Sequence, residues 1–161
     1  MSEFEDKLKR AIERGQEQSL EQARQEQQQQ LTEDEYRRKH TDFRLAISDQ
    51  IELLMKQVVD HLPGFEYETV YGEKGWGGAI SRDDIQIADG KRAALFSRLE
   101  ITVRPYSDVH VVDLNGKGTV RNQEVYFRNL HKLLDEAELD LFLSAVDQWV
   151  LDYAEQYANK S

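Results

Sequence analysis

The sequence predicts an α+β fold in which an antiparallel meander of four to five strands packs by one face against two amphipathic helices. Three observations support this prediction. Apolar residues recur at helical spacing in the first and last parts of the chain, and at alternate positions between residues 65 and 127. Short turn-forming segments separate the alternating stretches, so neighbouring strands should run antiparallel. The 161 residues suffice for one domain with its own hydrophobic core.

The composition limits the class of protein. The chain has no cysteine, which excludes disulfide frameworks, thiolate metal sites and cysteine nucleophiles. We expect a cytoplasmic location and no membrane partner, because the N-terminus lacks the basic and apolar regions of a secretory signal and no apolar stretch approaches the ~20 residues that span a bilayer. A formal net charge of -10 argues against nucleic acid as a partner, since affinity for phosphates depends on clustered Lys and Arg.

Residues 1–31 are expected to form a polar extension outside the domain. They are rich in Gln and Glu and poor in large apolar side chains, a composition typical of frayed helices or disordered segments. Phe4, Leu8 and Ile12 nevertheless repeat every four residues. This repeat leaves a second interpretation open, a helix that docks on a partner or on a second subunit.

The domain itself is expected to span residues 32–161 and to open with a long helix. Thr32 and Glu35 form a capping box, in which both side chains satisfy backbone amides at a helix start. Pro63 and Gly64 should end the helix, because proline disfavours helical angles in the preceding residue. The expected apolar stripe consists of Phe43, Ile47, Ile51, Leu54, Val58 and Leu62.

Two glycine-rich or polar stretches within the sheet half are interpreted as loops. Residues 72–78 hold four glycines but match neither phosphate-binding glycine pattern, so we expect a hairpin loop. Trp76 in this loop is a candidate contact residue, because large aromatic side chains on loops often anchor partners. Residues 83–93 are expected to form a second loop.

The clearest strands are expected at residues 95–104, 108–114 and 119–127. A two-residue turn at Asn115 and Gly116 would join the last two strands, and a three-residue loop at residues 105–107 the first two.

These turns fix the expected registers, because hairpin pairing follows from the turn. They place Thr102 opposite His110, and His110 opposite Arg121. The face covered by helices would then consist of Leu99, Ile101, Val103, Val109, Val111 and Val120.

The opposite sheet face is predicted to be polar, with Val112 and Thr119 beside its charged residues. It is either a solvated face with cross-strand charge pairs or a surface for a small anionic ligand or a partner, since arginine forks bind carboxylate and phosphate. Its candidate binding residues are Arg98, Glu100, Arg104, His110 and Arg121.

A second amphipathic helix is expected at residues 136–158. One face carries apolar residues at helical spacing, and the other face is acidic, which is typical of a solvated helix surface.

No pattern in the sequence supports catalysis. The four histidines do not form a zinc-binding pair on a helix, and there is no nucleophile elbow. We therefore expect no catalytic residues, metal or cofactor, and we interpret the chain as a non-catalytic protein-interaction module, an adaptor or accessory protein. Its partner would be another protein or a second copy in a homodimer. The alternative is an enzyme or small anionic-ligand binder that uses the polar sheet face.

Overall fold

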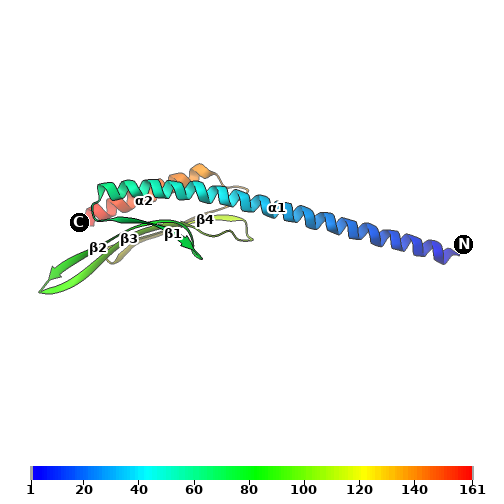
Figure 1. The fold of residues 1–161 in the computed structure, drawn as a ribbon, viewed down its shortest axis with the longest axis horizontal. Helices are drawn as coiled ribbons and strands as arrows, with labels where there is room; N and C mark the ends of the chain where they lie inside the picture. Colours follow the sequence, from blue (N-terminus) through cyan, green and yellow to red (C-terminus); the bar gives the residue numbers. More distant parts are fainter. Residues whose placement is uncertain (1, 161) are drawn as a thin grey trace. The chain divides into compact units, whose positions relative to one another are not determined.

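The structure is a computed structural model that describes residues 2–160, apart from the side chains of residues 29–31 and 160. Residues 1 and 161, which the expected ranges include, lie outside it. The chain divides into two compact units, Met1–Arg38 and Lys39–Ser161. The described elements, in chain order, are α1 (Glu3–His61), β1 (Glu66–Gly72), β2 (Gly75–Ala88), β3 (Lys91–Val103), β4 (Val111–Val120), β5 (Gln123–Leu133) and α2 (Leu139–Lys160) (Figure 1).

The first unit consists of the N-terminal part of helix α1. The Ser2 Oγ accepts a hydrogen bond from the backbone amide of Glu5 at 3.3 Å, so Ser2 caps the helix. The expected helix start at Thr32 is wrong, because the helix already begins at Glu3. The Thr32 hydroxyl instead donates to the Gln28 carbonyl at 2.9 Å, as threonine hydroxyls do inside helices. A domain boundary between residues 31 and 32 stays a prediction.

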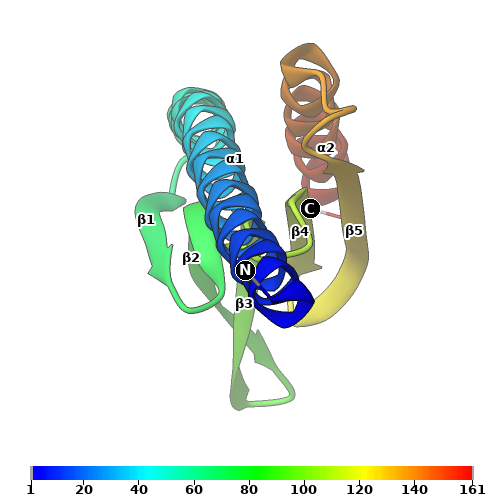
Figure 2. The same cartoon turned by 90° about the vertical axis from the view of Figure 1, so that its right-hand side faces the viewer.

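The second unit is an α+β fold, as predicted. Its five strands form one antiparallel sheet in the order β1-β2-β3-β4-β5. The C-terminal part of α1 and helix α2 both lie over the same face of this sheet (Figure 2). Neither helix among the described residues is long and apolar enough to cross a membrane.

The hydrophobic core lies between the two helices and the covered sheet face. The rings of Phe43 on α1 and Phe142 on α2 meet edge to face, with centroids 6.0 Å apart. The largest fully buried aliphatic side chains are Ile47, Ile51, Met55, Ile80, Leu99, Ile101, Leu114 and Leu134. The predicted helical stripe and the alternate positions of β3 therefore supply the core.

The hydroxyls of a half-buried and a fully buried tyrosine also connect helix α2 to the sheet. The Tyr126 hydroxyl on β5 donates to the Trp149 carbonyl at 2.9 Å, and the Tyr153 hydroxyl on α2 donates to the Thr119 carbonyl at 2.7 Å. Burial raises the pKa of both phenols. The two hydroxyls therefore stay neutral donors at physiological pH and fix the position of the helix.

The expected turn at Asn115 and Gly116 is wrong, because both residues lie inside strand β4. The chain reverses instead at Arg121 and Asn122, which have φ angles of 49° and 70°. A Cβ atom on Gly116 would lie 2.7 Å from Cε3 of Trp149. The glycine therefore makes room for the tryptophan ring against the strand.

The expected registers are wrong for the same reason. Thr102 pairs with Asn115 instead of His110, which precedes β4. Val109 also precedes β4 and is 67% exposed, although it was expected in the core. Val112, expected on the polar face, is fully buried.

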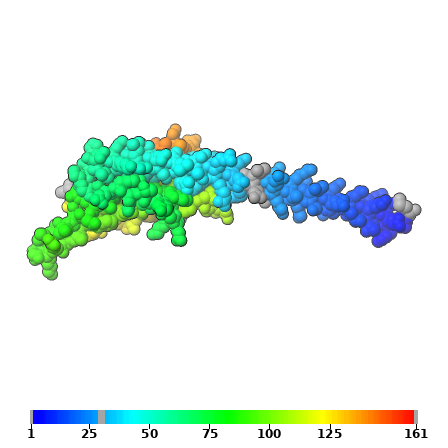
Figure 3. All heavy atoms as spheres, in the orientation of Figure 1, coloured from blue at the N-terminus to red at the C-terminus, as the bar shows by residue number. Residues whose placement is uncertain are grey.

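Both expected loops contain strands joined by tight hairpins. β1 and β2 reverse at residues 73–74. β2 and β3 reverse at Asp89 and Gly90, whose φ angles of 54° and 76° suit a type I′ turn. Past Ser81 on β2 and Arg98 on β3, these two strands pair only with each other, so their hairpin projects from the sheet (Figure 3).

Candidate functional site

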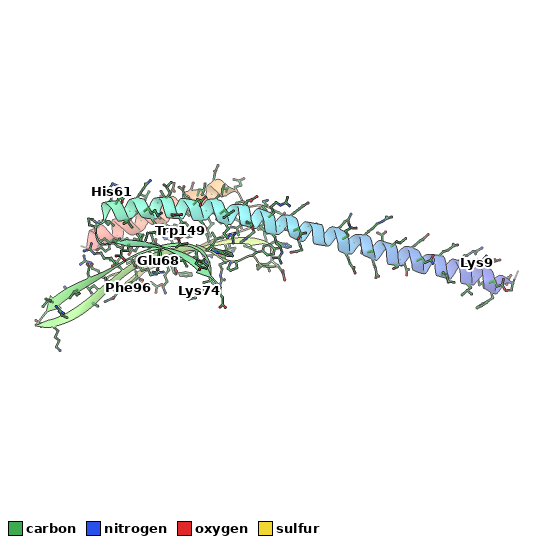
Figure 4. The ribbon with its side chains drawn as sticks, in the orientation of Figure 1. Lys9, His61, Glu68, Lys74, Phe96 and Trp149 are labelled. Atoms are coloured by element: carbon green, nitrogen blue, oxygen red, sulfur yellow. The ribbon has the colours of Figure 1, made fainter. Side chains whose placement is uncertain are left out.

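An apolar groove of about 440 Å³ lies between α1 and α2. Figure 4 labels His61, which lines it at the C-terminal end of α1. The other lining residues are Leu54, Gln57, Val58, Leu62, Asp147, Val150, Leu151 and Ala154.

Helix geometry explains why this part of α1 lines a groove. Ile47, Ile51 and Met55 repeat every four residues and are fully buried. Leu54 and Val58 lie about 100° from Met55 and Val59 around the helix, because each residue turns the helix by that angle. They consequently face α2 and are only half-buried.

The groove has large apolar side chains in contact with solvent. Leu151, on its α2 wall, is 64% exposed. Leu53, next to the α1 wall, is 54% exposed. Contiguous exposed apolar surface of this kind marks interaction sites more often than isolated apolar residues do.

One wall of the groove carries carboxylates. Asp147 on α2 lines the groove, and Glu155, the residue after Ala154 of the same wall, is exposed. Gln50 Nε2 donates to Asp147 Oδ1 at 2.7 Å and links the two helices. Among the described side chains that line the groove, His61 is the only one able to carry positive charge.

The residues predicted on the polar sheet face are only partly brought together. Arg98 and Glu100 lie side by side on that face, with Arg98 Nη2 and Glu100 Oε1 3.3 Å apart. Arg98 Nη1 also pairs with Glu68 Oε1 on β1 at 2.5 Å (Figure 4). The Arg98 guanidinium, which was expected to bind an anion, is therefore already paired with two carboxylates of the protein itself.

The remaining predicted residues lie elsewhere. Arg104 follows β3, with its Nη1 3.9 Å from Asp113 Oδ2. His110 precedes β4, and its ring centroid is 6.1 Å from that of Tyr106. Arg121 lies in the β4–β5 turn, where its Nε is buried without a hydrogen-bond partner in the described part of the chain.

Trp76 lies in strand β2, not in a loop. Its ring is half-buried on the helix side of the sheet, and the Arg44 guanidinium of α1 lies 3.8 Å from the ring centroid. This cation–π contact joins helix and sheet. Any binding role of Trp76 stays a prediction.

A polar cluster on the uncovered sheet face was missed at the sequence level. Asn129 Nδ2 donates to Asp113 Oδ1 at 2.5 Å and to Asn115 Oδ1 at 2.8 Å. His131 Nδ1 lies 2.6 Å from Asn129 Oδ1. The four residues pair across β4 and β5, Asp113 with His131 and Asn115 with Asn129. The correct register would have revealed this cluster.

The outer-face cluster consists of Asp113, Asn115, Asn129 and His131. All of them except Asn115 line a hollow of about 610 Å³, which Arg104 also lines. An Nδ1–H donor to Asn129 would leave His131 Nε2 as an acceptor. Within residues 2–160, no group of three or more His, Asp or Glu side chains is placed to hold a metal ion.

His40 is a buried polar residue that the sequence did not single out. Its Nε2 donates to the Arg104 carbonyl at 3.2 Å, and its ring meets Tyr106 edge to face. Burial, with a smaller effect from Arg44, lowers the pKa of His40. The neutral ring thereby holds the connection between β3 and β4 against α1.

Comparison with known proteins adds no functional assignment. No protein-family model matches the chain, and no significant match was found among curated proteins or solved structures.

Proposed function

We propose that this protein is a non-catalytic interaction module that binds a helical segment of a partner in the groove between α1 and α2. The observation that supports the proposal is the exposed apolar groove, about 440 Å³, between two helices that are already packed on a sheet. Because the helices are held by the core, the groove is preformed. Little ordering is then needed when a partner binds.

The groove chemistry defines the segment. An amphipathic helix presents apolar side chains at i, i+3, i+4 and i+7, which suits an apolar groove between two helices. The acidic side chain of Asp147 lines this groove, and the exposed Glu155 follows Ala154 of the same wall. Basic residues beside the apolar stripe of the partner would complement them and speed its association.

A photo-crosslinking residue placed in the groove tests the proposal. Benzoylphenylalanine at Leu151 would report partners bound in the groove. The same residue at Leu45, also exposed on α1 but outside the groove, is the matched control. In a lysate of the source cells, we expect the Leu151 probe to label segments with an amphipathic, basic sequence, and the Leu45 probe not to.

Crosslinking at increasing salt concentration is a second part of this experiment. The labelling at Leu151 should decrease with added salt, because exposed charges are screened over about 8 Å at physiological ionic strength. Equal labelling from both positions, or labelled segments without an apolar stripe, would contradict helix binding in the groove.

A second candidate function is the binding of a small anionic ligand at the outer-face cluster. The observation that favours it is the hollow of about 610 Å³ that brings Arg104 beside His131 and Asn129. Inorganic phosphate, titrated into the protein at constant ionic strength, should shift the NMR signals of His131. Arg104→Gln should remove the shift. If chloride shifted the His131 signals as much as phosphate does, the shift would not indicate a specific anion site.

A further inference from the structure

The N-terminal part of α1 carries an exposed apolar stripe with no function in its own unit. Phe4, Leu8 and Ile12 are spaced four residues apart and are 70%, 47% and 53% exposed. Packing within this stretch does not account for these side chains, since every described residue from 2 to 28 is exposed. Large apolar residues that repeat on one helix face are typical of a face that packs against another element.

Basic side chains follow the same stretch. Lys7, Arg10 and Arg14 are spaced three and four residues apart, so they lie on one side of the helix beside the apolar stripe. Residues 4–14 contain four basic side chains and three acidic ones, Glu5, Asp6 and Glu13. The segment is therefore an amphipathic helix with a small net positive charge within an acidic chain.

The segment and the groove agree in length, and their charges are opposite in sign. From Phe4 to Ile12 the stripe extends over about 12 Å, at 1.5 Å per residue. Leu54 to Leu62, the α1 wall of the groove, covers the same number of residues and thus the same length. Lys7, Arg10 and Arg14 lie beside the stripe, whereas Asp147 lines the groove and Glu155 lies next to its α2 wall.

We propose that the groove of one molecule binds residues 4–14 of a second copy of this chain. This inference rests on the proposed function and names its partner. The contact joins the first unit of one molecule to the second unit of another. Apolar side chains of the stripe enter the groove, and cations among Lys7, Arg10 and Arg14 pair with Asp147 and Glu155.

Sedimentation equilibrium of the full chain tests this self-association. The extension variant replaces Leu8 and Ile12 by Ser, and the groove variant is Leu151→Lys, which removes an apolar contact and adds a repelling charge. Each should weaken self-association at least about tenfold, because side chains at the centre of an interface contribute most of its affinity. All three residues are exposed, so the fold should persist.

Two exposed leucines outside the proposed contact serve as matched controls. Leu20→Ser controls for the loss of apolar surface in the first unit, and Leu45→Lys controls for the added charge on a helix of the second unit. Neither should change self-association more than about twofold. Added salt should weaken self-association of the unmodified chain.

Mixing the two variants gives the sharpest result. The extension variant keeps an intact groove, and the groove variant keeps an intact extension. Each alone should be monomeric at concentrations where the unmodified chain self-associates, yet their mixture should form a complex. If two extensions paired with each other, the groove variant would self-associate on its own and the mixture would form no complex that contains both variants, which would overturn the inference.

Two other results would also overturn it. One is an unmodified chain that stays monomeric at every concentration tested. The other is self-association that neither variant weakens. If the Leu151 crosslinks then map to a foreign basic helix, the proposed function stands while the second copy is excluded. If the Leu151 crosslinks map to no helical segment, the proposed function and the self-association both fail.

Discussion

At the scale of single residues, close approach between an aromatic ring and a glycine fixes the position of α2. Trp149 packs where a side chain at Gly116 would stand, because the added Cβ would be 2.7 Å from its Cε3. Gly118 is similarly close to the rings of Tyr126 and Tyr153. Strand β4 thus uses glycines inside a strand, where they weaken local propensity but admit three rings.

Gly116→Ala should therefore lower the free energy of unfolding by about 1–3 kcal/mol, the usual penalty for an overpacked contact. Urea denaturation measures the change. In a Trp149→Leu background the same substitution should be less damaging, because the crowded ring is gone. An equal loss in both backgrounds would mean that the glycine is required for its backbone and not for the contact.

His40 should make the free energy of unfolding depend on pH in the mildly acidic range. Its pKa is below the ordinary value of 6.5, so the unfolded chain takes up a proton more readily than the folded one. Stability from this residue is present above that value and decreases as the pH falls below it. Lowering the pH from about 7.5 to about 5.5 should thus reduce the free energy of unfolding.

The matched variant is His40→Gln, which keeps a donor for the Arg104 carbonyl but does not titrate. Its free energy of unfolding should change less between the two pH values than that of the unmodified protein. The measurement is urea denaturation at both pH values. An identical pH dependence would assign the effect to another group.

At the scale of elements, the buried faces of the helices were predictable, whereas the start of α1 and the strand pairings were not. Apolar spacing reports which face of a helix is buried, so Ile47 and Ile51 were correctly placed in the core. Registers depend on turns, and Asn115-Gly116 has the composition of a turn although it lies inside a strand. The pair Asp89-Gly90 forms a true turn but was assigned to a loop.

The groove could not be predicted, because it depends on how two helices distant in the sequence pack together. Leu54, Val58 and Leu62 belong to a stripe that the spacing assigned to the core. Only the packing of α2 shows that these residues line a solvent-open groove. The outer-face cluster was missed because its members become neighbours only in the correct register of β4 and β5.

Thr32 offers a direct test of where α1 begins. Thr32→Ala should leave the helix content unchanged or slightly higher, because the hydroxyl bonds back to Gln28 within a helix and alanine is the better helix former. The helix content of the full chain is measured by circular dichroism at about 222 nm, where helices absorb. At an N-cap, the same change would destabilise the helix by ~1 kcal/mol and lower its content.

At the scale of the whole molecule, the core belongs to the second unit alone. Every buried apolar side chain of the described residues lies at Phe43 or beyond. Deleting residues 1–31 should consequently leave cooperative thermal unfolding intact, with a free energy of unfolding within about 0.5 kcal/mol of the full chain. Loss of cooperative unfolding would show that the domain extends further towards the N-terminus.

The projecting β2–β3 hairpin is a suitable place to insert a foreign peptide segment. Its Asp89-Gly90 turn lies far along the two-stranded ribbon, and a Cβ built at Gly90 meets no atom within 4 Å. Exposed turns that carry no core contact accept inserted sequence more readily than other sites. An epitope grafted between these two residues would be presented away from the core, and the groove between α1 and α2 would stay accessible.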